Sequence, residues 1–560
     1  MREEDEMFGE VFFEATALAV AAFIVFTSHR ATVRKKERLK YLTELEDYCL
    51  EIRHRYAERR ILSDAVFASF DPTRKTIRDF AYGMTRAFGS DISGASPAAG
   101  FGEKTEEPYE KLLISVCGLI DEYGDDGSGS FAQTLLKIAV DIREERRYLS
   151  KRMHSFKGLA ATAAIPCLFV LPLGRWGTDT IPSLLSFYHG SGGVYQRCLI
   201  LALSFICGTA VQIISDPVSF REKFGKPGRS REIADFPGRM PGALNSFIRQ
   251  TLDRLDIRVG VGRLRYLSFV TAGIFFALTS IGIFLGHLDM KTDYVHDTSD
   301  IESTLAIADS AQINAARRVI PYLMVNTLER GMKYTEEELY DEIMNAGISN
   351  AQEAGKVADE FYRRLEGYES EEFDLCDLLF TIAMIIAGWF LPVAALLALC
   401  VAAGSSVKEE VMRFEAVIDL EKDVSGMTVP IMLENMMSFA SVTKGALIKT
   451  IMDYNTNETE AFEHLTAYSN DRSLKRLAGF FLMTDMLGIR NAFDEVSAEL
   501  EGMREERRLD RALRLEDETM LAGILGVIPG GLVVFGYLLV PFITRSLEMF
   551  NAYSDSLGMI

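Results

Sequence analysis

Long apolar stretches alternate with highly charged stretches along this chain. A helix needs roughly 20 mostly apolar residues to cross a bilayer. Six stretches approach that length: 11–28, 158–174, 198–214, 266–286, 378–404 and 520–543. Soluble proteins rarely keep a helix apolar for so long. The pattern therefore predicts an all-α polytopic membrane protein with about six transmembrane helices.

The charged stretches have helical periodicity of their own. In 41–70, apolar residues recur at three- and four-residue spacing on one stripe: Leu42, Leu45, Tyr48, Cys49, Ile52 and Tyr56. Ser63 and Asp64 resemble an N-cap region for the next helix, and the Gly-, Ser- and Pro-rich segment 89–108 predicts a loop. Further helices are predicted at 109–124, 131–153, 336–368, 408–424, 429–455 and 473–518. We therefore predict two helical bundles between the spans.

The charges beside the spans predict an orientation. Six Lys or Arg residues fall within 29–40, directly after the first span, and the positive-inside rule makes that flank cytoplasmic. The acidic segment before this span is not the basic start of a cleavable signal peptide. Residues 217–265 hold 11 Lys/Arg against 5 Asp/Glu, whereas 290–372 hold 8 against 18. The former segment is expected inside and the latter outside.

With the first span oriented in this way, the chain is expected to cross the inner (cytoplasmic) membrane six times and to divide into nine parts. Both termini are then extracytoplasmic. The parts are an N-terminal transmembrane anchor (1–28), cytoplasmic helical bundle 1 (29–157), a transmembrane hairpin (158–214), a basic cytoplasmic loop (215–265), a transmembrane helix (266–286), an acidic extracytoplasmic helical segment (287–377), a transmembrane helix (378–404), cytoplasmic helical bundle 2 (405–519), and a C-terminal transmembrane helix with a short tail (520–560).

One five-residue motif occurs in both predicted bundles. The sequence Arg-Glu-Glu-Arg-Arg stands at 143–147 and again at 504–508. Glycine precedes a phenylalanine before each copy (Gly127 and Gly129 before Phe131, Gly488 before Phe493), and an Ile-Pro pair follows in the next span (Pro166, Pro529). Charged sequences of this kind are also common on solvent-exposed helix faces. The shared order and spacing favour two divergent copies of one helical membrane module.

Composition and motifs exclude several classes of function. The 560 residues carry a net charge of −20, which argues against nucleic acid as a partner. None of the seven cysteines forms a CxxC pair, so neither a disulfide framework nor a zinc site is expected. The chain contains neither a Walker loop nor an H-E-x-x-H motif. We therefore expect a protein that is not an enzyme and has no cofactor or metal of its own.

About half of the chain, 29–175 and 405–550, resembles the platform proteins of type II secretion, type IV pilus, tight-adherence pilus and archaellum machines. The similar segments are "RRILSDAVF" (59–67), "TKGALIKTI" (443–451), "GIRNAFDEVSAELEGMREERR" (488–508), the looser "GSGSFAQTLLKIAVDIREERR" (127–147), and "ILGVIPGGLVVFGYLLVPFI" (524–543). The sequence departs from the family pattern at Glu58-Arg59-Arg60, where a small residue is usual, and in its enlarged middle section.

This resemblance implies a scaffold that couples a separate secretion or pilus ATPase to the assembly or export of pilin-like subunits. It also implies an oligomer, either with itself or with a related platform protein, in the lipid bilayer. Candidate ATPase contacts are Arg143, Glu144, Glu145, Arg146 and Arg147, with Arg504, Glu505, Glu506, Arg507 and Arg508. Solvated helix faces are the alternative for both clusters. Charged helices 131–157 and 494–519 are expected to continue into spans and carry motion.

Small and kinking residues in the spans are candidates for helix packing or for docking a pilin helix: Pro166, Gly523, Gly526, Pro529, Gly530 and Gly531. Two other functions remain open, a polytopic transporter and a sensory membrane protein. A transporter should carry ionisable residues within its spans, and the spans predicted here have almost none. A sensor should carry an output domain, and none is visible.

Overall fold

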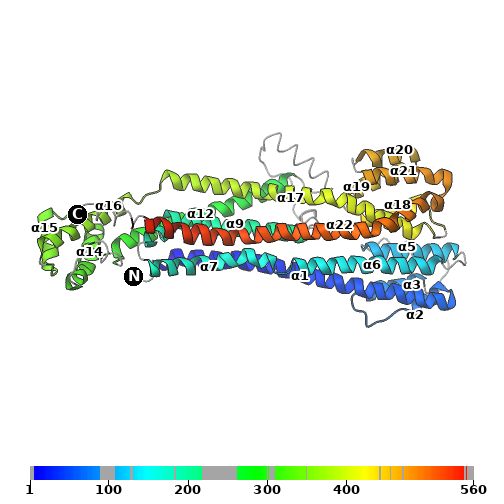
Figure 1. Cartoon of the computed structure of the whole chain (residues 1–560), viewed down its shortest axis with the longest axis horizontal. Coiled ribbons are helices and arrows are strands. Elements are labelled where there is room, and N and C mark those ends of the chain that lie inside the picture. The colour runs from blue at the N-terminus through cyan, green and yellow to red at the C-terminus, as the bar shows by residue number, and fades with distance from the viewer. Residues whose placement is uncertain are drawn as a thin grey trace.

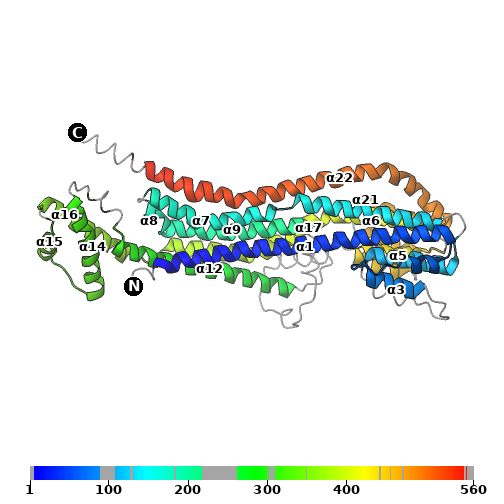
Figure 2. The ribbon, with the colours of Figure 1, turned by 90° about the horizontal axis from the view of Figure 1, so that it is seen from below.

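Six helices lie along the length of the molecule and are long and apolar enough to span a membrane, as the computed structural model shows in Figures 1 and 2. They lie within Gly9–Arg59, Phe131–Thr180, Ser191–Ser215, Leu264–His296, Leu375–Leu396 and Arg511–Leu547. Each contains one of the six predicted apolar stretches or most of it. The prediction of an all-α polytopic protein is confirmed.

The structure describes most of the chain, and every regular element within the described residues is helical. These residues are 6–88, 107–125, 130–181, 184–216, 261–298, 301, 305, 310–348, 350–424, 426–440, 443–454, 456–468, 472–547 and 550. Residues 89–106 of the predicted loop 89–108, nearly all of the basic loop 215–265, and Gly127 and Gly129 lie outside them.

Three helices pass from an apolar span into charged sequence without a break. They are α1 (Glu6–Arg59), α17 (Leu375–Glu421) and α22 (Ile489–Gly531). The boundaries expected at 28, 404 and 519 therefore fall inside helices. In α1 the reason is plain, because no glycine or proline occurs between residues 10 and 59 to stop the helix.

The other spans are α7 (Leu159–Thr180), α9 (Ser191–Ser215) and α12 (Val261–His296), with the short α8 (Leu185–Tyr188) before α9. Helix α6 (Ser130–Ser155) precedes α7, but a turn at 156–158 separates the two, with Gly158 at φ 87°. The prediction that 131–157 continues into its span is therefore wrong. A glycine with positive φ ends a helix readily, and this one does.

At one end of the molecule, the bundle end, shorter helices lie beside the extensions of the long ones (Figure 1). They are α2 (Leu62–Ala68), α3 (Arg78–Phe88), α5 (Pro108–Tyr123), α18 (Val429–Phe439), α19 (Lys444–Tyr454), α20 (Glu458–Tyr468) and α21 (Arg472–Leu487). The predicted stripe from Leu42 to Tyr56 is buried as expected. Helix α2 begins after Ile61, so Ser63 and Asp64 lie inside its first turn and do not cap it.

The two predicted bundles share one hydrophobic core. Residues of 42–142 and residues of 411–493 belong to the same buried cluster. Tyr109 of α5 packs edge-on against Phe439 of α18, with ring centroids 5.2 Å apart. The chain therefore folds its two charged regions into a single bundle, where the sequence had suggested two.

The opposite end, here called the acidic end, carries α14 (Ser310–Arg330), α15 (Glu336–Asn345) and α16 (Ala351–Ser370). These helices have a separate small core that includes Leu323, Leu339 and Phe361. The helix predicted over 336–368 is interrupted at 346–350, where Gly347 has φ 109°. Both charged regions thus lie at one end of the spans and the acidic segment at the other, as the predicted order of the spans requires.

Candidate functional site

The first Arg/Glu cluster mainly fastens α6 to α1. Arg143 Nε donates a 2.6 Å hydrogen bond to Glu46 Oε1, and Arg146 Nη2 lies 3.4 Å from Glu46 Oε2. Arg146 Nη1 also lies 3.3 Å from the Thr43 hydroxyl. Glu46 is only 4% exposed. A carboxylate so far from water is stabilised by its cationic partners, so these two arginines support the fold.

The other cluster residues have different surroundings. Glu145 accepts a 3.2 Å hydrogen bond from Arg413 of α17, which links the two halves of the bundle. Glu144 is half-buried and Arg147 is exposed. In the second cluster, Arg504, Glu505, Glu506, Arg507 and Arg508 belong to α22, but their side chains lie outside the described part of the structure. Arg147 is thus the described cluster residue most open to a partner.

A polar seam joins the halves beneath this surface. Lys137 donates to the Asp419 carbonyl oxygen at 3.0 Å and lies 3.5 Å from its carboxylate. Asn435 Nδ2 donates to Ser115 Oγ at 2.9 Å and also to Glu421 Oε1. Burial of Glu421 in this seam raises its pKa well above the ordinary value. Glu421 therefore lies within the join between the two halves.

Each half contains the same carboxylate–threonine clamp. Glu44 of α1 accepts hydrogen bonds from the backbone N–H and the hydroxyl of Thr76, which lies just before α3. Glu410 of α17 accepts the same two bonds from Thr443, just before α19, at 2.9 and 2.8 Å. The sequence separations are 32 and 33 residues. By this clamp, the segment 443–451 has the same place in the second half as α3 has in the first.

A second correspondence lies at the helix that leads into each charged helix. Helices α5 and α21 have 16 residues each. Gly124 ends the first with φ 76° and ψ 173°, and Gly488 ends the second with φ 77° and ψ 157°. Few residues other than glycine adopt this conformation. Gly124, which the sequence comparison passed over in favour of Gly127 and Gly129, is thus the counterpart of Gly488.

Pro166 of α7 and Gly530 of α22 lie close to one another. A side chain added at Gly530 would lie 3.7 Å from Pro166 of α7, and one added at Gly526 would collide with Thr162. After Pro529 and Gly531 the α22 backbone continues as the π-helix η3 (Leu532–Leu539). Gly523 and Gly531 have no such neighbour within 4 Å. Gly526 and Gly530 therefore pack within the chain, whereas the other two leave room for another helix.

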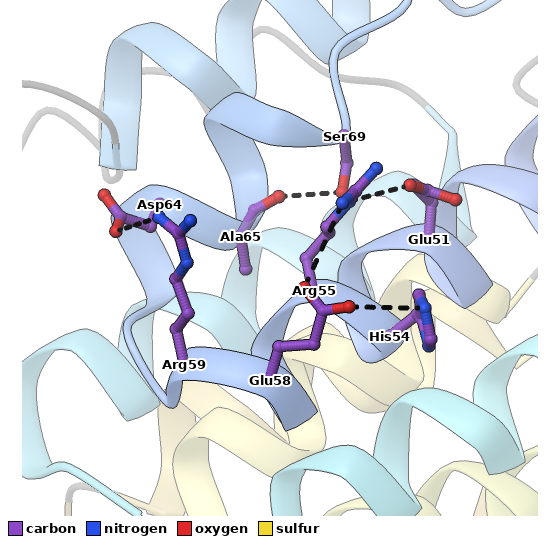
Figure 3. Close-up of polar contacts among 8 residues, drawn as sticks. All are labelled: Glu51, His54, Arg55, Glu58, Arg59, Asp64, Ala65 and Ser69. Carbon is purple, nitrogen blue, oxygen red and sulfur yellow. Dashed lines mark hydrogen bonds and ion pairs between the residues drawn. The ribbon is translucent and has the colours of Figure 1, made fainter.

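The corner between α1 and α2 carries exposed ion pairs, drawn in Figure 3. Arg55 lies 3.0 Å from Glu51 and 4.0 Å from Glu58, and Arg59 lies 3.5 Å from Asp64. Arg60, between the two helices, has φ 54°. Among the described residues other than glycine, it is the only one with a positive φ. Such exposed pairs contribute little to stability, so this corner is a surface rather than a structural join.

Sequence reasoning missed a polar cluster where the spans meet the acidic end. Arg197 of α9 is 5% exposed. It donates to the Tyr537 hydroxyl at 3.1 Å and to the Tyr188 carbonyl oxygen at 3.0 Å. Its guanidinium also lies 5.5 Å from the Phe13 ring centroid. Arg197 falls one residue before the predicted span 198–214, which is why the sequence analysis did not single it out.

A histidine of α12 extends this cluster. His287 Nδ1 lies 2.8 Å from Glu371 Oε1, and its Nε2 lies 3.0 Å from Asp377 Oδ2. Tyr195 donates to the same Asp377 carboxylate. Beside it, a pocket of about 250 Å³ is lined by Phe187, Gly190, Ser191, Gly192, Met290, Glu371 and Arg545. Since His287 falls one residue after the predicted span, it escaped the sequence analysis in the same way.

Comparisons with known proteins add no relative. No protein-family model, no curated protein and no solved structure matches the chain. Within the described residues, no three His, Cys, Asp or Glu side chains are grouped as metal ligands would be.

Proposed function

We propose that this protein is a non-enzymatic membrane platform of a pilus or secretion machine. In this proposal the bundle end faces the cytoplasm and meets a separate secretion ATPase, and the spans receive pilin-like subunits. The observation that supports it best is the mechanical connection. Helices α1, α17 and α22 leave one shared hydrophobic core and enter three different spans without a break.

A continuous helix transmits displacement because its backbone hydrogen bonds resist stretching and bending. A motor that moved the bundle would therefore move three spans together. Helix α7 is separated from α6 by the turn at 156–158 and is not part of this continuous connection. Its Pro166 lies against Gly530 at the α-to-π transition of the last span. The open faces of Gly523 and Gly531 offer a close approach for a subunit's own helix.

Co-purification tests this proposal. The tagged full-length protein, extracted from the membranes of its source cells, should retain a hexameric secretion ATPase and show no ATP hydrolysis of its own. Arg147→Glu should weaken that association, because Arg147 is the exposed member of the first cluster. Lys333→Glu, an equal charge change at an exposed position of the acidic end, is the control. Membranes that contain such an ATPase and yield none of it with the protein would contradict the proposal.

The buried polar cluster supports one alternative, an ion-coupled transporter. Ionisable groups inside a membrane commonly mark an ion or substrate path. The reconstituted protein would then carry an ion current or take up solute in proteoliposomes, and His287→Ala would abolish it. The platform proposal predicts no flux with either protein.

A further inference from the structure

Two short segments beside the spans contain cations and no acids. Residues 29–36 of α1 and residues 147–158, which cover the end of α6 and the turn after it, together contain eight Lys or Arg residues and no Asp or Glu. The chain as a whole has 80 acidic residues against 60 Lys and Arg. A local excess of positive charge in so acidic a chain favours a negatively charged ligand at this place.

Both segments lie at the same level, where the span α9 ends. Lys35 Nζ donates to the carbonyl oxygen of Ser215 at 3.0 Å, and Arg152 Nε donates to the same oxygen at 3.1 Å. Ser215 is the last residue of α9. Helices α1 and α6, which lie side by side in Figures 1 and 2, therefore bring their basic segments together where the spans meet the bundle.

The cations of these segments form two sets. Lys35 and Arg152 are used within the protein, and Arg152 also lies 2.9 Å from Glu518 of α22. The second set, here called the basic surface, is exposed, and within the described residues its side chains form no hydrogen bond or ion pair. It consists of Arg30, Lys36, Arg147, Lys151 and Lys157.

The depth of the basic surface indicates what it meets. Phe26, Arg30 and Val33 share one face of α1 at i, i+4 and i+7 spacing, and all three are exposed, Phe26 to 64%. An exposed phenylalanine at the end of a span faces lipid, so the next positions on its face lie at the depth of the headgroups. Lys157 stands two residues before α7 begins at Leu159. Long cationic side chains at such positions reach headgroup phosphates readily.

The last span does not extend this surface. The ion pair of Arg152 with Glu518 places the end of the charged part of α22 at the same level. Residues 510–519 there hold two Arg against four Asp or Glu, and Glu516 and Asp517 are exposed. Within the described residues, the excess of positive charge therefore belongs to the side formed by α1 and α6.

We propose that the basic surface binds the headgroups of anionic phospholipids. A headgroup with a net negative charge is attracted to the unpaired cations, whereas a zwitterionic headgroup brings its own ammonium group and gains less. The bound lipid lies beside the place where α1, α6 and α9 are fastened together at Ser215. This inference involves neither an ATPase nor a transported subunit, so it goes beyond the proposed function.

Lipid-selective quenching of a single tryptophan tests the proposal. Val33→Trp, combined with Trp176→Phe and Trp389→Phe, places the only tryptophan of the full-length protein beside the basic surface. The protein is reconstituted in phosphatidylcholine bilayers that contain a fixed fraction of brominated lipid, either phosphatidylglycerol or phosphatidylcholine, with the bromines near the headgroup end of the chains. The brominated phosphatidylglycerol should quench about twofold more strongly, because the cations concentrate it beside the tryptophan. High salt should reduce this ratio.

Three lysines of the surface supply the decisive variant. In the Val33→Trp protein, Lys36→Gln, Lys151→Gln and Lys157→Gln together should lower the quenching ratio to about one, whereas arginine at the same three positions should preserve it. The matched control removes three exposed lysines of the bundle end, with Lys75→Gln, Lys444→Gln and Lys449→Gln, and should leave the ratio unchanged. All these residues are exposed, so each variant should keep its melting temperature.

The native Trp176 supplies a control at the other end of the spans. It is 56% exposed on α7, and with Trp389→Phe alone it is the only tryptophan. The two brominated lipids should quench it equally. Equal quenching in the Val33→Trp protein would overturn the proposal, as would a preference for phosphatidylglycerol that survives the three Lys→Gln changes. The same preference at Trp176 would also overturn it, since the anionic lipid would then not be concentrated at α1 and α6.

Discussion

A buried carboxylate, that of Glu46, helps to hold α1 and α6 together. Glu46 carries two arginine partners, and the same arginines belong to the motif that occurs twice in the sequence. Their positions were predictable from the sequence, but their role was not. The periodicity of a helix indicates which residues share one of its faces. The partner of Arg143, Glu46, is 97 positions away in the sequence, and their contact depends on the fold.

Replacing Arg143 and Arg146 together by alanine should destabilise the bundle by about 1–3 kcal/mol, the cost of leaving a buried acceptor such as Glu46 without its donors. Arg147→Ala, which removes an exposed charge from the same helix, should change stability little. Thermal unfolding in detergent, followed by far-UV circular dichroism, measures both. Equal melting temperatures for the two variants would show that Glu46 does not depend on this pair.

Glu421 should make the bundle less stable as the pH rises. Its burial raises the pKa in the folded state above that of the unfolded chain. Below about pH 4.5 Glu421 is protonated in both the folded and the unfolded state, and no stability is lost. Above that pH the unfolded state ionises first, and stability falls by up to about 1.4 kcal/mol per pH unit until the folded pKa is reached.

Glu421→Gln should therefore stabilise the protein at pH 8 and flatten this part of the pH dependence. Glu434→Gln on the exposed side of α18 is the control and should leave the slope unchanged. Denaturant midpoints between pH 5 and pH 8 supply the measurement. A slope that survives Glu421→Gln intact would assign it to another group.

At the scale of elements, periodicity and apolar length were sufficient to predict the helices but not their ends. The stripe from Leu42 to Tyr56 and the six apolar stretches came directly from spacing and composition. The change from apolar to charged sequence at residue 28 suggested the end of a helix. A helix continues through such a change where glycine and proline are absent. The break at Gly158 needed the backbone angle, because glycine also occurs inside helices here, as at Gly118.

The two helix-ending glycines should respond alike to substitution if they belong to equivalent modules. Gly124→Ala and Gly488→Ala should each cost about 1–3 kcal/mol, because a β-carbon is strained at positive φ and extended ψ. Gly118→Ala in α5 is the matched control. No atom lies within 4 Å of an added β-carbon there, and helical Gly→Ala stabilises by up to about 1 kcal/mol. A loss at only one of the two glycines would argue against equivalence.

At the scale of the whole molecule, the order of spans was predictable and the merging of the two bundles was not. Charge asymmetry and the repeated motif placed both charged regions on one side of the spans. The shared core depends on contacts such as Tyr109 with Phe439 and Arg413 with Glu145, which join residues about 270 to 330 positions apart. The polar cluster around Arg197 and His287 depends on contacts between residues 340 and 90 positions apart, and Arg197 and His287 stand just outside the predicted apolar stretches.

The proposed platform function requires that the two modules form one bundle on the cytoplasmic side, with the acidic end outside. Arg59→Cys, Met452→Cys and Met332→Cys, made singly in a Cys376→Ser background, place an exposed cysteine on each module and on the acidic end. A membrane-impermeant maleimide applied to intact cells should label position 332 and leave 59 and 452 unlabelled until the membrane is opened. Labelling of 59 and 452 from opposite faces would contradict the account.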